Sequence, residues 1–279
     1  MKRSALIVLF FVFAKTSNAQ DLPAPSNRQQ PEVIRISIPP KVESNDYEEW
    51  VVEFSAEYWA LKPTGDARFA SFSTNLAGDL GIEGWKSHPS AKAAIQFTRR
   101  NKLLIEGLLY RLSGGNVLQR TLDFQGSTFA AGDQSQSTIK LASVYAGYER
   151  DFYSKKHGFA GILAGINYLE ANTKLRDVSI GVEEYGDTRL AFPTLGGSFR
   201  IYPAQGHVLN FNGEFKGMTL GNYGKYLDGE MNVGLSFSRT VTIELGFRGV
   251  GAELHNKYET NGVRTTFRGP VISFQWRDR

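Results

Sequence analysis

Strict two-residue alternation of apolar and polar side chains in the last fifty residues is the feature that most constrains this fold. Its apolar members are Met231, Val233, Leu235, Phe237, Val241, Ile243, Leu245 and Phe247. A period of two places every second side chain on the same face of a β-strand. Only Arg239 and Thr240 separate the two runs. The sequence therefore predicts a hairpin of two antiparallel strands with one apolar and one polar face.

The length of these runs indicates their surroundings. Strands in soluble proteins usually have about five or six residues, whereas a strand that crosses a bilayer needs roughly 9–11. A closed barrel is the β-structure that satisfies every backbone polar group in hydrocarbon. In such a barrel, Arg at Leu235 or Ile243 is expected to cost roughly 2–4 kcal/mol near the midplane. The alternative is a soluble, secreted, lipocalin-like binding barrel with its apolar face inside.

The amino-terminal residues have the layout of a secretory signal peptide. Lys2 and Arg3 precede an apolar run over 5–14, and Ser17-Asn18-Ala19 offers a small-x-small cleavage site. The apolar run has only about half of the roughly twenty residues that a membrane-spanning helix needs. We therefore expect residues 1–19 to be a signal peptide that is cleaved after Ala19.

Composition divides the rest of the chain and excludes some functions. Residues 20–48 contain five of the ten prolines, which is typical of an extended linker, expected here in the periplasm before a barrel domain over 49–279. Removing the three cations of the signal peptide from 32 Lys and Arg leaves 29 against 28 Asp and Glu. A net charge of +1 argues against nucleic acid as a partner. The absence of Cys excludes thiol catalysis and thiolate metal sites.

Ten strands can be placed after Trp50. They are expected over 50–58, 91–98, 103–112, 137–148, 158–169, 190–202, 208–218, 226–238, 241–254 and 263–276. Long outer loops are expected over 62–88 and 170–187, and 113–136 is expected to be a hairpin extension that projects on the outer side. Eight strands result if one hairpin is discarded, and twelve if 121–129 crosses with another segment. The sequence thus predicts an all-β, transmembrane, antiparallel up-and-down barrel of about ten strands.

The last predicted strand carries Ile272, Phe274 and Trp276 on one face. This pattern resembles the carboxy-terminal targeting strand of bacterial outer-membrane barrels. With the signal peptide and the strand pattern, the chain after Trp50 resembles the small OmpA/OmpW-like outer-membrane barrel proteins of Gram-negative bacteria. The resemblance implies a monomer in the outer membrane, in contact with its lipids. It also implies that the barrel-assembly machinery recognises the terminal strand.

Alternation also predicts which charged side chains face the interior of the barrel. They are Glu53, Glu57, Glu106, Arg200, Glu214, Lys216, Glu230, Glu244 and Arg248. These charges could form a selectivity or ligand site, or an internal salt-bridge network that fills the lumen. A barrel of about ten strands is barely wide enough for side chains, which favours the network. We expect pairs between Glu230 and Arg248 and between Glu214 and Lys216, because unpaired buried charges are costly.

Catalysis would need a base beside a hydroxyl or a carboxylate. The four histidines, His88, His157, His207 and His255, fall in predicted loops or turns. His88 has Ser87 and Ser90 nearby, and none of the four has the Asp pair and Asp–His couple of an omptin-like protease. We therefore expect no catalytic residue, cofactor or metal site, with a lipid-modifying hydrolase as the weaker alternative. The leading expectation is a structural or surface-exposed barrel, or a narrow passive channel for small solutes.

Overall fold

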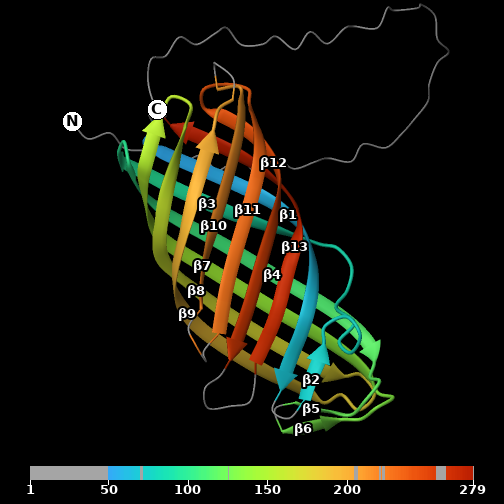
Figure 1. The fold of residues 1–279 in the computed structure, drawn as a ribbon. Coiled ribbons are helices and arrows are strands. Elements are labelled where there is room, and N and C mark those ends of the chain that lie inside the picture. Colours follow the sequence, from blue (N-terminus) through green and yellow to red (C-terminus); the bar gives the residue numbers. More distant parts are fainter. Residues whose placement is uncertain are drawn as a thin grey trace, which may run out of the picture. The chain divides into compact units, whose positions relative to one another are not determined.

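A closed antiparallel barrel of ten strands makes up most of the described chain (Figure 1). The computed structural model describes residues 50–69, 72–124, 126–203, 207–219, 221, 224–255 and 262–278. The barrel strands are β1 (Val52–Phe69), β3 (Lys86–Thr98), β4 (Asn101–Val117), β7 (Gln134–Lys155), β8 (Gly158–Asp177), β9 (Glu183–Ile201), β10 (Leu209–Thr219), β11 (Gly224–Ser236), β12 (Val241–His255) and β13 (Gly262–Asp278). The predicted ten-stranded up-and-down barrel is confirmed. The expected signal peptide and linker lie outside the described residues.

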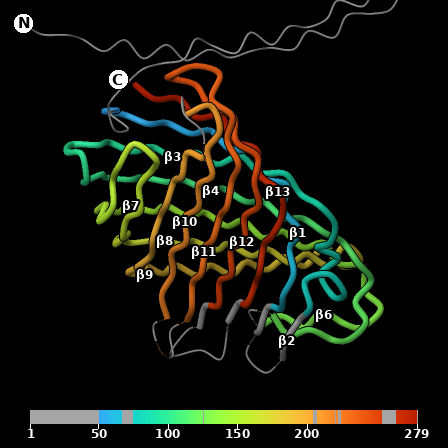
Figure 2. The backbone as a smooth tube through the Cα atoms, turned by 45° about the horizontal axis from the view of Figure 1, so that its top comes forward, coloured from blue at the N-terminus to red at the C-terminus, as the bar shows by residue number. Residues whose placement is uncertain are grey.

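The hydrogen-bond register fixes how the barrel closes. Neighbouring strands are antiparallel throughout, and β13 pairs with β1 (Figure 2). Following paired residues around the barrel from Val52 of β1 leads back to β1 at Thr64, twelve residues further along. With ten strands, this stagger corresponds to a strand tilt of about 40°. That tilt is typical of membrane barrels.

The two ends of the barrel differ. The start of β1, the end of β13 and the short connections such as 99–100 and 156–157 lie at one end, at the top of Figure 1. At the opposite end lie β2 (Phe72–Asn75) and the hairpin of β5 (Leu122–Phe124) and β6 (Ser127–Phe129). Short turns of such barrels face the periplasm. We therefore name the first end periplasmic and the second end outer.

Several strands are longer at the outer end than the sequence predicts. β1 continues to Phe69, and β8 and β9 are separated only by residues 178–182, so much of the predicted loops 62–88 and 170–187 is strand. Beyond the apolar band a strand faces water or lipid headgroups and needs no apolar face. The alternation therefore fades there, although the hydrogen-bond ladder continues.

The segment 113–136 differs from the projecting hairpin that the sequence predicts. β4 ends at Val117 and β7 begins at Gln134, and the β5–β6 hairpin lies between them. Leu122, Phe124 and Phe129 of this hairpin are buried in the hydrophobic core of the barrel. The hairpin therefore covers the outer end.

The outer wall carries an apolar band. Along β11 the exposed apolar residues run from Leu235 to Leu227, with Met231 midway and 65% exposed. Eight residues of a strand tilted by about 40° rise about 21 Å, comparable with the roughly 25 Å band of an outer-membrane barrel. The predicted terminal-strand residues also face outward, namely Ile272, Phe274 and Trp276. Because apolar side chains lie outside and charges inside, the lipocalin-like alternative is wrong.

Trp50 precedes the first barrel strand. Its side chain is buried at the periplasmic end of the lumen rather than turned to lipid. The described residues include no helix long and apolar enough to cross a membrane.

Candidate functional site in the barrel lumen

An apolar plug fills the outer half of the lumen. We define it by its buried residues: Trp59, Leu61, Leu76, Leu80, Ile82, Leu108, Tyr110, Leu112, Leu118, Leu122, Phe124, Phe129, Ile139, Leu169, Leu175, Phe192, Tyr226, Val250, Phe267 and Val271. Its aromatic rings stack, with Tyr110 and Phe267 centroids 5.4 Å apart and Phe192 and Tyr226 centroids 6.3 Å apart. Residues from the loops at the outer end complete the plug at that end of the lumen.

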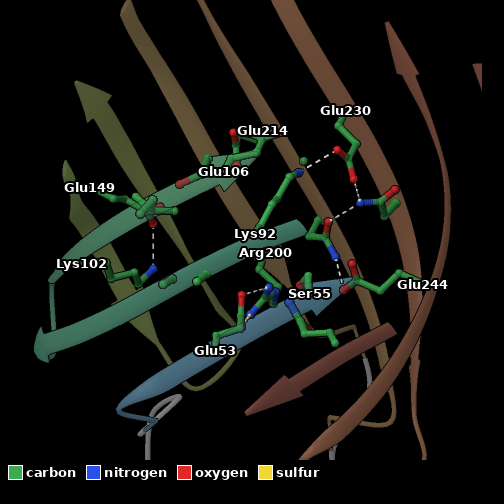
Figure 3. A pocket seen from close by; sticks show the side chains of 18 of the residues that line it. Glu53, Ser55, Lys92, Lys102, Glu106, Glu149, Arg200, Glu214, Glu230 and Glu244 are labelled. Carbon is green, nitrogen blue, oxygen red and sulfur yellow. Dashed lines mark hydrogen bonds and ion pairs between the residues drawn. The ribbon is translucent and has the colours of Figure 1, made fainter. Parts of the chain in front are cut away.

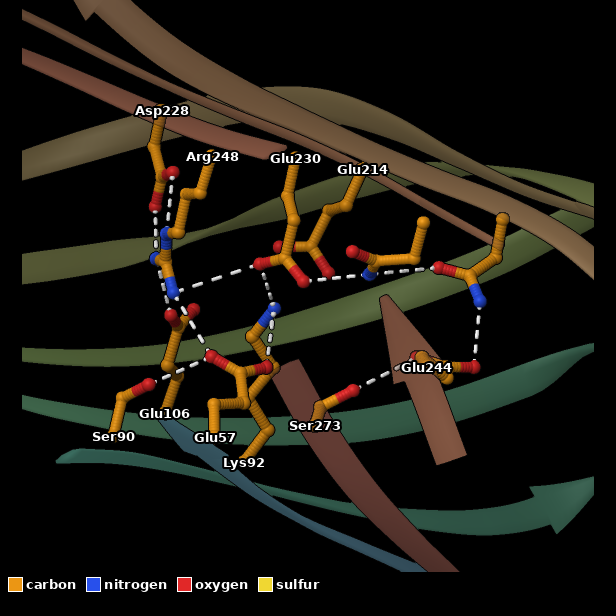
Figure 4. A network of polar contacts seen from close by, with 12 residues as sticks. Glu57, Ser90, Lys92, Glu106, Glu214, Asp228, Glu230, Glu244, Arg248 and Ser273 are labelled. Atoms are coloured by element: carbon orange, nitrogen blue, oxygen red, sulfur yellow. Dashed lines mark hydrogen bonds and ion pairs between the residues drawn. The ribbon is translucent and has the colours of Figure 1, made fainter. Parts of the chain in front are cut away.

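An ionic network, which we call the central network, adjoins the plug on its periplasmic side, where Arg248 lies against the ring of Trp59; Figure 4 shows the residues of the network. Arg248 of β12 is at its centre, with a fully buried side chain. Its guanidinium donates to Asp228 (Nε–Oδ1 3.1 Å, Nη2–Oδ2 2.5 Å) and, through Nη2, to Glu106. Nη1 donates to Glu57 at 3.2 Å and lies 3.6 Å from Glu230. Arg248 thus joins four carboxylates contributed by β1, β4 and β11.

Two lysines share the same carboxylates. Lys92 Nζ of β3 lies 2.7 Å from Glu230 and 3.1 Å from Glu57. Lys216 Nζ of β10 pairs with Glu214 at 2.6 Å. The other partners of Lys216 are Glu106 and Asp228, the latter at 3.7 Å.

The central network is more acidic than basic. Among the described residues, three cations meet five carboxylates: Lys92, Lys216 and Arg248 face Glu57, Glu106, Glu214, Asp228 and Glu230. Each cation therefore has more than one anionic partner, and losing one cation leaves several carboxylates uncompensated in a low-dielectric interior.

A second group of charges, the basal group, lies nearer the periplasmic end (Figure 3). Glu53 accepts hydrogen bonds from Arg200 at 3.2 Å and from Arg277 at 2.6 Å. Between β4 and β7, Lys102 pairs with Glu149 at 2.7 Å and with Asp151 at 3.1 Å. These contacts tie β13 and β9 to β1, and β4 to β7.

Amide and hydroxyl side chains extend the central network toward the basal group. Glu244 of β12 accepts from Asn212 at 2.6 Å and from Ser273 at 3.2 Å. Asn232 donates to Asn212 at 3.1 Å and to Glu230 at 2.6 Å. A polar cavity of about 90 Å³ remains between these side chains, below the plug.

Every charged residue that was predicted to face inward lies on the inner wall of the barrel. Glu57, Glu106, Glu214, Lys216, Glu230 and Arg248 come together in the central network, and both expected pairs are present. Glu53 and Arg200 belong to the basal group instead, and Glu244 lies between the groups.

Sequence reasoning missed several members of these groups. Lys92, Asp228 and Arg277 were not assigned to the interior, although each lies two residues from an inward polar side chain on its own strand. Lys102 lies next to the turn at 99–100, and Glu149 and Asp151 lie beyond residue 148, where the predicted strand ends. Continuing the alternation one or two residues further would have found Asp228 and Arg277.

Three of the four histidines lie apart from these networks. His88 is buried on β3 with its ring edge-on to Tyr110. His157 is exposed in the turn after β7. His207 stacks on Tyr202 at 4.1 Å and makes a 2.9 Å hydrogen bond with the carbonyl of Lys156. His255 is the last residue of β12.

Comparison with known proteins identifies the fold. No family model and no curated protein matches the sequence. The outer membrane protease OmpT from Escherichia coli has a TM-score of 0.56 at 8% identity, over 84% of this chain and 99% of that one. Ail, the attachment invasion locus protein of Yersinia pestis, has a TM-score of 0.34 at 9% identity, over 82% and 99%. The toluene transporter TodX of P. putida has a TM-score of 0.27 at 7% identity, over 81% and 90%.

Only the first of these three likenesses has a TM-score above 0.5, and at 8% identity it shows a shared fold alone. This likeness, the closed barrel of ten strands and the outward apolar band together define the class. The chain has the β-barrel fold of Gram-negative outer-membrane proteins.

Proposed function

We propose that this protein is a sealed outer-membrane barrel with a structural or surface-exposed role, rather than an open channel or an enzyme. The observation that carries the proposal is the filled lumen. The apolar plug occupies the outer half, and the central network lies across the barrel below it. Hydrated solutes would have to displace both layers in order to pass.

A narrow passive channel is the second candidate, and the 90 Å³ polar cavity is the observation that favours it. The cavity is lined by charges of both signs, including Lys92, Arg200 and Glu244. An opening of the plug would join this cavity to the outside. The sealed barrel is the better supported of the two, because the plug is continuous with the buried loop residues of the outer end.

Non-enzymatic function remains part of the proposal. OmpT is named a protease, but the likeness to it concerns the fold. Hydrolysis needs a base within hydrogen-bond reach of a hydroxyl, a carboxylate or a water. Nε2 of the buried His88 has no hydrogen-bond partner among the described residues, and His207 contacts a backbone carbonyl. These contacts give no support to a hydrolase.

The same proposal includes export and assembly. Cleavage after Ala19 would release a monomeric barrel with a periplasmic linker over 20–48. The barrel-assembly machinery would recognise the strand that carries Ile272, Phe274 and Trp276. These side chains form an outward apolar row on β13, which is hydrogen-bonded on both sides in the closed barrel.

Liposome swelling tests the sealed lumen. We expect liposomes that contain the folded protein to swell in an isotonic arabinose or glycerol solution at the rate of empty liposomes, because the plug leaves no continuous aqueous path. A general porin reconstituted in parallel provides the positive control. Swelling that depends on the amount of this protein and falls with solute size would support the channel instead.

A further inference from the structure

A basic groove lies on the outside of the barrel wall near the outer end. It has a volume of about 590 Å³ and is formed by β4, β7, β8 and β9. Its cations are Arg111, Lys140, Lys174, Arg176 and Arg189, and the one acidic residue in its lining is Asp187. These cations alternate along their strands with buried residues of the plug, such as Leu112 and Ile139, and so they face outward.

Three of these cations have no anionic partner within the described part of the chain. Lys174 pairs with Glu183 at 2.7 Å, and Arg189 with Glu170 at 3.3 Å. Arg111, Lys140 and Arg176 make no such ion pair among the described residues. The groove is therefore strongly positive.

Two of these cations lie so close together that a bound anion would be favourable. Arg111 of β4 and Lys140 of β7 lie directly opposite each other in the antiparallel ladder. Like charges in directly opposite positions destabilise a sheet. An anion bound between them would remove that repulsion, and a phosphate suits both the guanidinium and the ammonium group.

The apolar band begins immediately on the periplasmic side of the groove, on the same wall. Leu109 lies two residues from Arg111 on β4, toward the periplasmic end, and is 68% exposed. Val144 lies four residues from Lys140 on β7, in the same direction, and is 50% exposed. A ligand whose phosphate lies in the groove would thus have an apolar surface beside its remaining part. That combination fits a lipid rather than a free anion.

We propose that this groove binds the phosphate of an outer-leaflet lipid, with Arg111 and Lys140 as its principal ligands. This inference rests on the placement of the barrel in the outer membrane. It does not depend on whether the lumen is sealed. The excess of cations in the groove also favours a headgroup that carries more than one negative charge.

Native mass spectrometry of the folded barrel, released from dodecylmaltoside micelles doped with diphosphoryl lipid A, tests the proposal. We expect one retained lipid per barrel. Retention of monophosphoryl lipid A should be weaker, and of phosphatidylcholine absent. The double change Arg111→Gln, Lys140→Gln should weaken lipid A binding by about tenfold or more, because two charge-assisted hydrogen bonds are lost.

The chain offers a matched control. Lys62 of β1 and Arg268 of β13 are also directly opposite, exposed cations, but they lie outside the groove. Lys62→Gln with Arg268→Gln should leave lipid A binding unchanged. Equal weakening by both double variants would overturn the site. Displacement of the lipid by an equal concentration of inorganic phosphate would overturn its assignment as a lipid site.

Two further readouts keep the test decisive. Heat-dependent gel mobility of the folded barrel checks that each variant is folded, and the glutamine changes should leave it unaltered because they remove a repulsion. If a variant fails to fold, the salt dependence of lipid A binding to the wild-type protein is measured instead. Binding at an exposed ionic site must become weaker as screening increases. Salt-independent binding would contradict the proposal. A barrel that conducts yet binds lipid A would overturn the sealed lumen alone, whereas a sealed barrel that binds none would overturn the groove alone.

Discussion

Replacing Arg248 by Ala is expected to lower the free energy of unfolding by about 3–5 kcal/mol, because removal of one partner leaves buried charges uncompensated. Four carboxylates depend on this guanidinium, and its side chain is 1% exposed. The change also empties space below Trp59, whose ring lies 5.4 Å from the guanidinium carbon. Urea unfolding of the barrel in liposomes, followed by gel mobility, measures the loss.

Arg268→Ala provides the control for this experiment. Arg248 pairs with Gly269 on the neighbouring strand, and Arg268 is the residue before Gly269. The side chain of Arg268 faces outward. Its loss should change the stability by less than about 0.5 kcal/mol. Glu57→Gln should cost less than Arg248→Ala, because four carboxylates would still surround the three cations of the central network. Equal stabilities of the Arg248 and Arg268 variants would show that the central network does not support the barrel.

An arginine at Met231 is the second change with a large expected effect. Met231 lies midway along the exposed apolar residues of β11. Arginine at the bilayer midplane costs about 2–4 kcal/mol in a membrane barrel, and about 0–1 kcal/mol near the interfaces. Leu235 pairs with Leu209, the first residue of β10, near the periplasmic edge. Leu235→Arg should therefore cost much less than Met231→Arg, measured by the same unfolding experiment.

This pair of variants also tests the sequence-based expectation, which gave the midplane cost to Leu235 or Ile243. Alternation identifies which face of a strand meets lipid, but it contains no information about depth. Depth follows from the register and the tilt, which require all ten strands together. If Leu235→Arg and Met231→Arg destabilise the barrel equally, the depth derived from the register is wrong.

The sequence predicted the barrel best where one face of a strand must meet lipid. Towards the periplasmic end of the apolar band most outward positions are apolar and most inward ones polar or small, and this pattern identified all ten strands. At the outer end outward positions such as Lys174 on β8 are charged, so no outward apolar period remains there, and the extensions of β8 and β9 were taken for a loop.

The interior was predictable only in part, for a different reason. Inward charges such as Glu57, Glu230 and Arg248 stand out against the apolar outward face. The plug could not be recognised, because its inward residues are as apolar as the lipid-facing ones: Leu108 lies inside and Leu109 outside. Lys92 was missed because its strand has alanine on both faces, which hides the alternation.

Ion current through the wild-type protein tests the sealed lumen most directly. Folded protein inserted into a planar bilayer at high salt should give little or no steady current, because the apolar plug and the central network leave no continuous path for ions. Insertion would be confirmed independently by protection of the barrel from added protease. A stable, large conductance from protein inserted in this way would contradict the account.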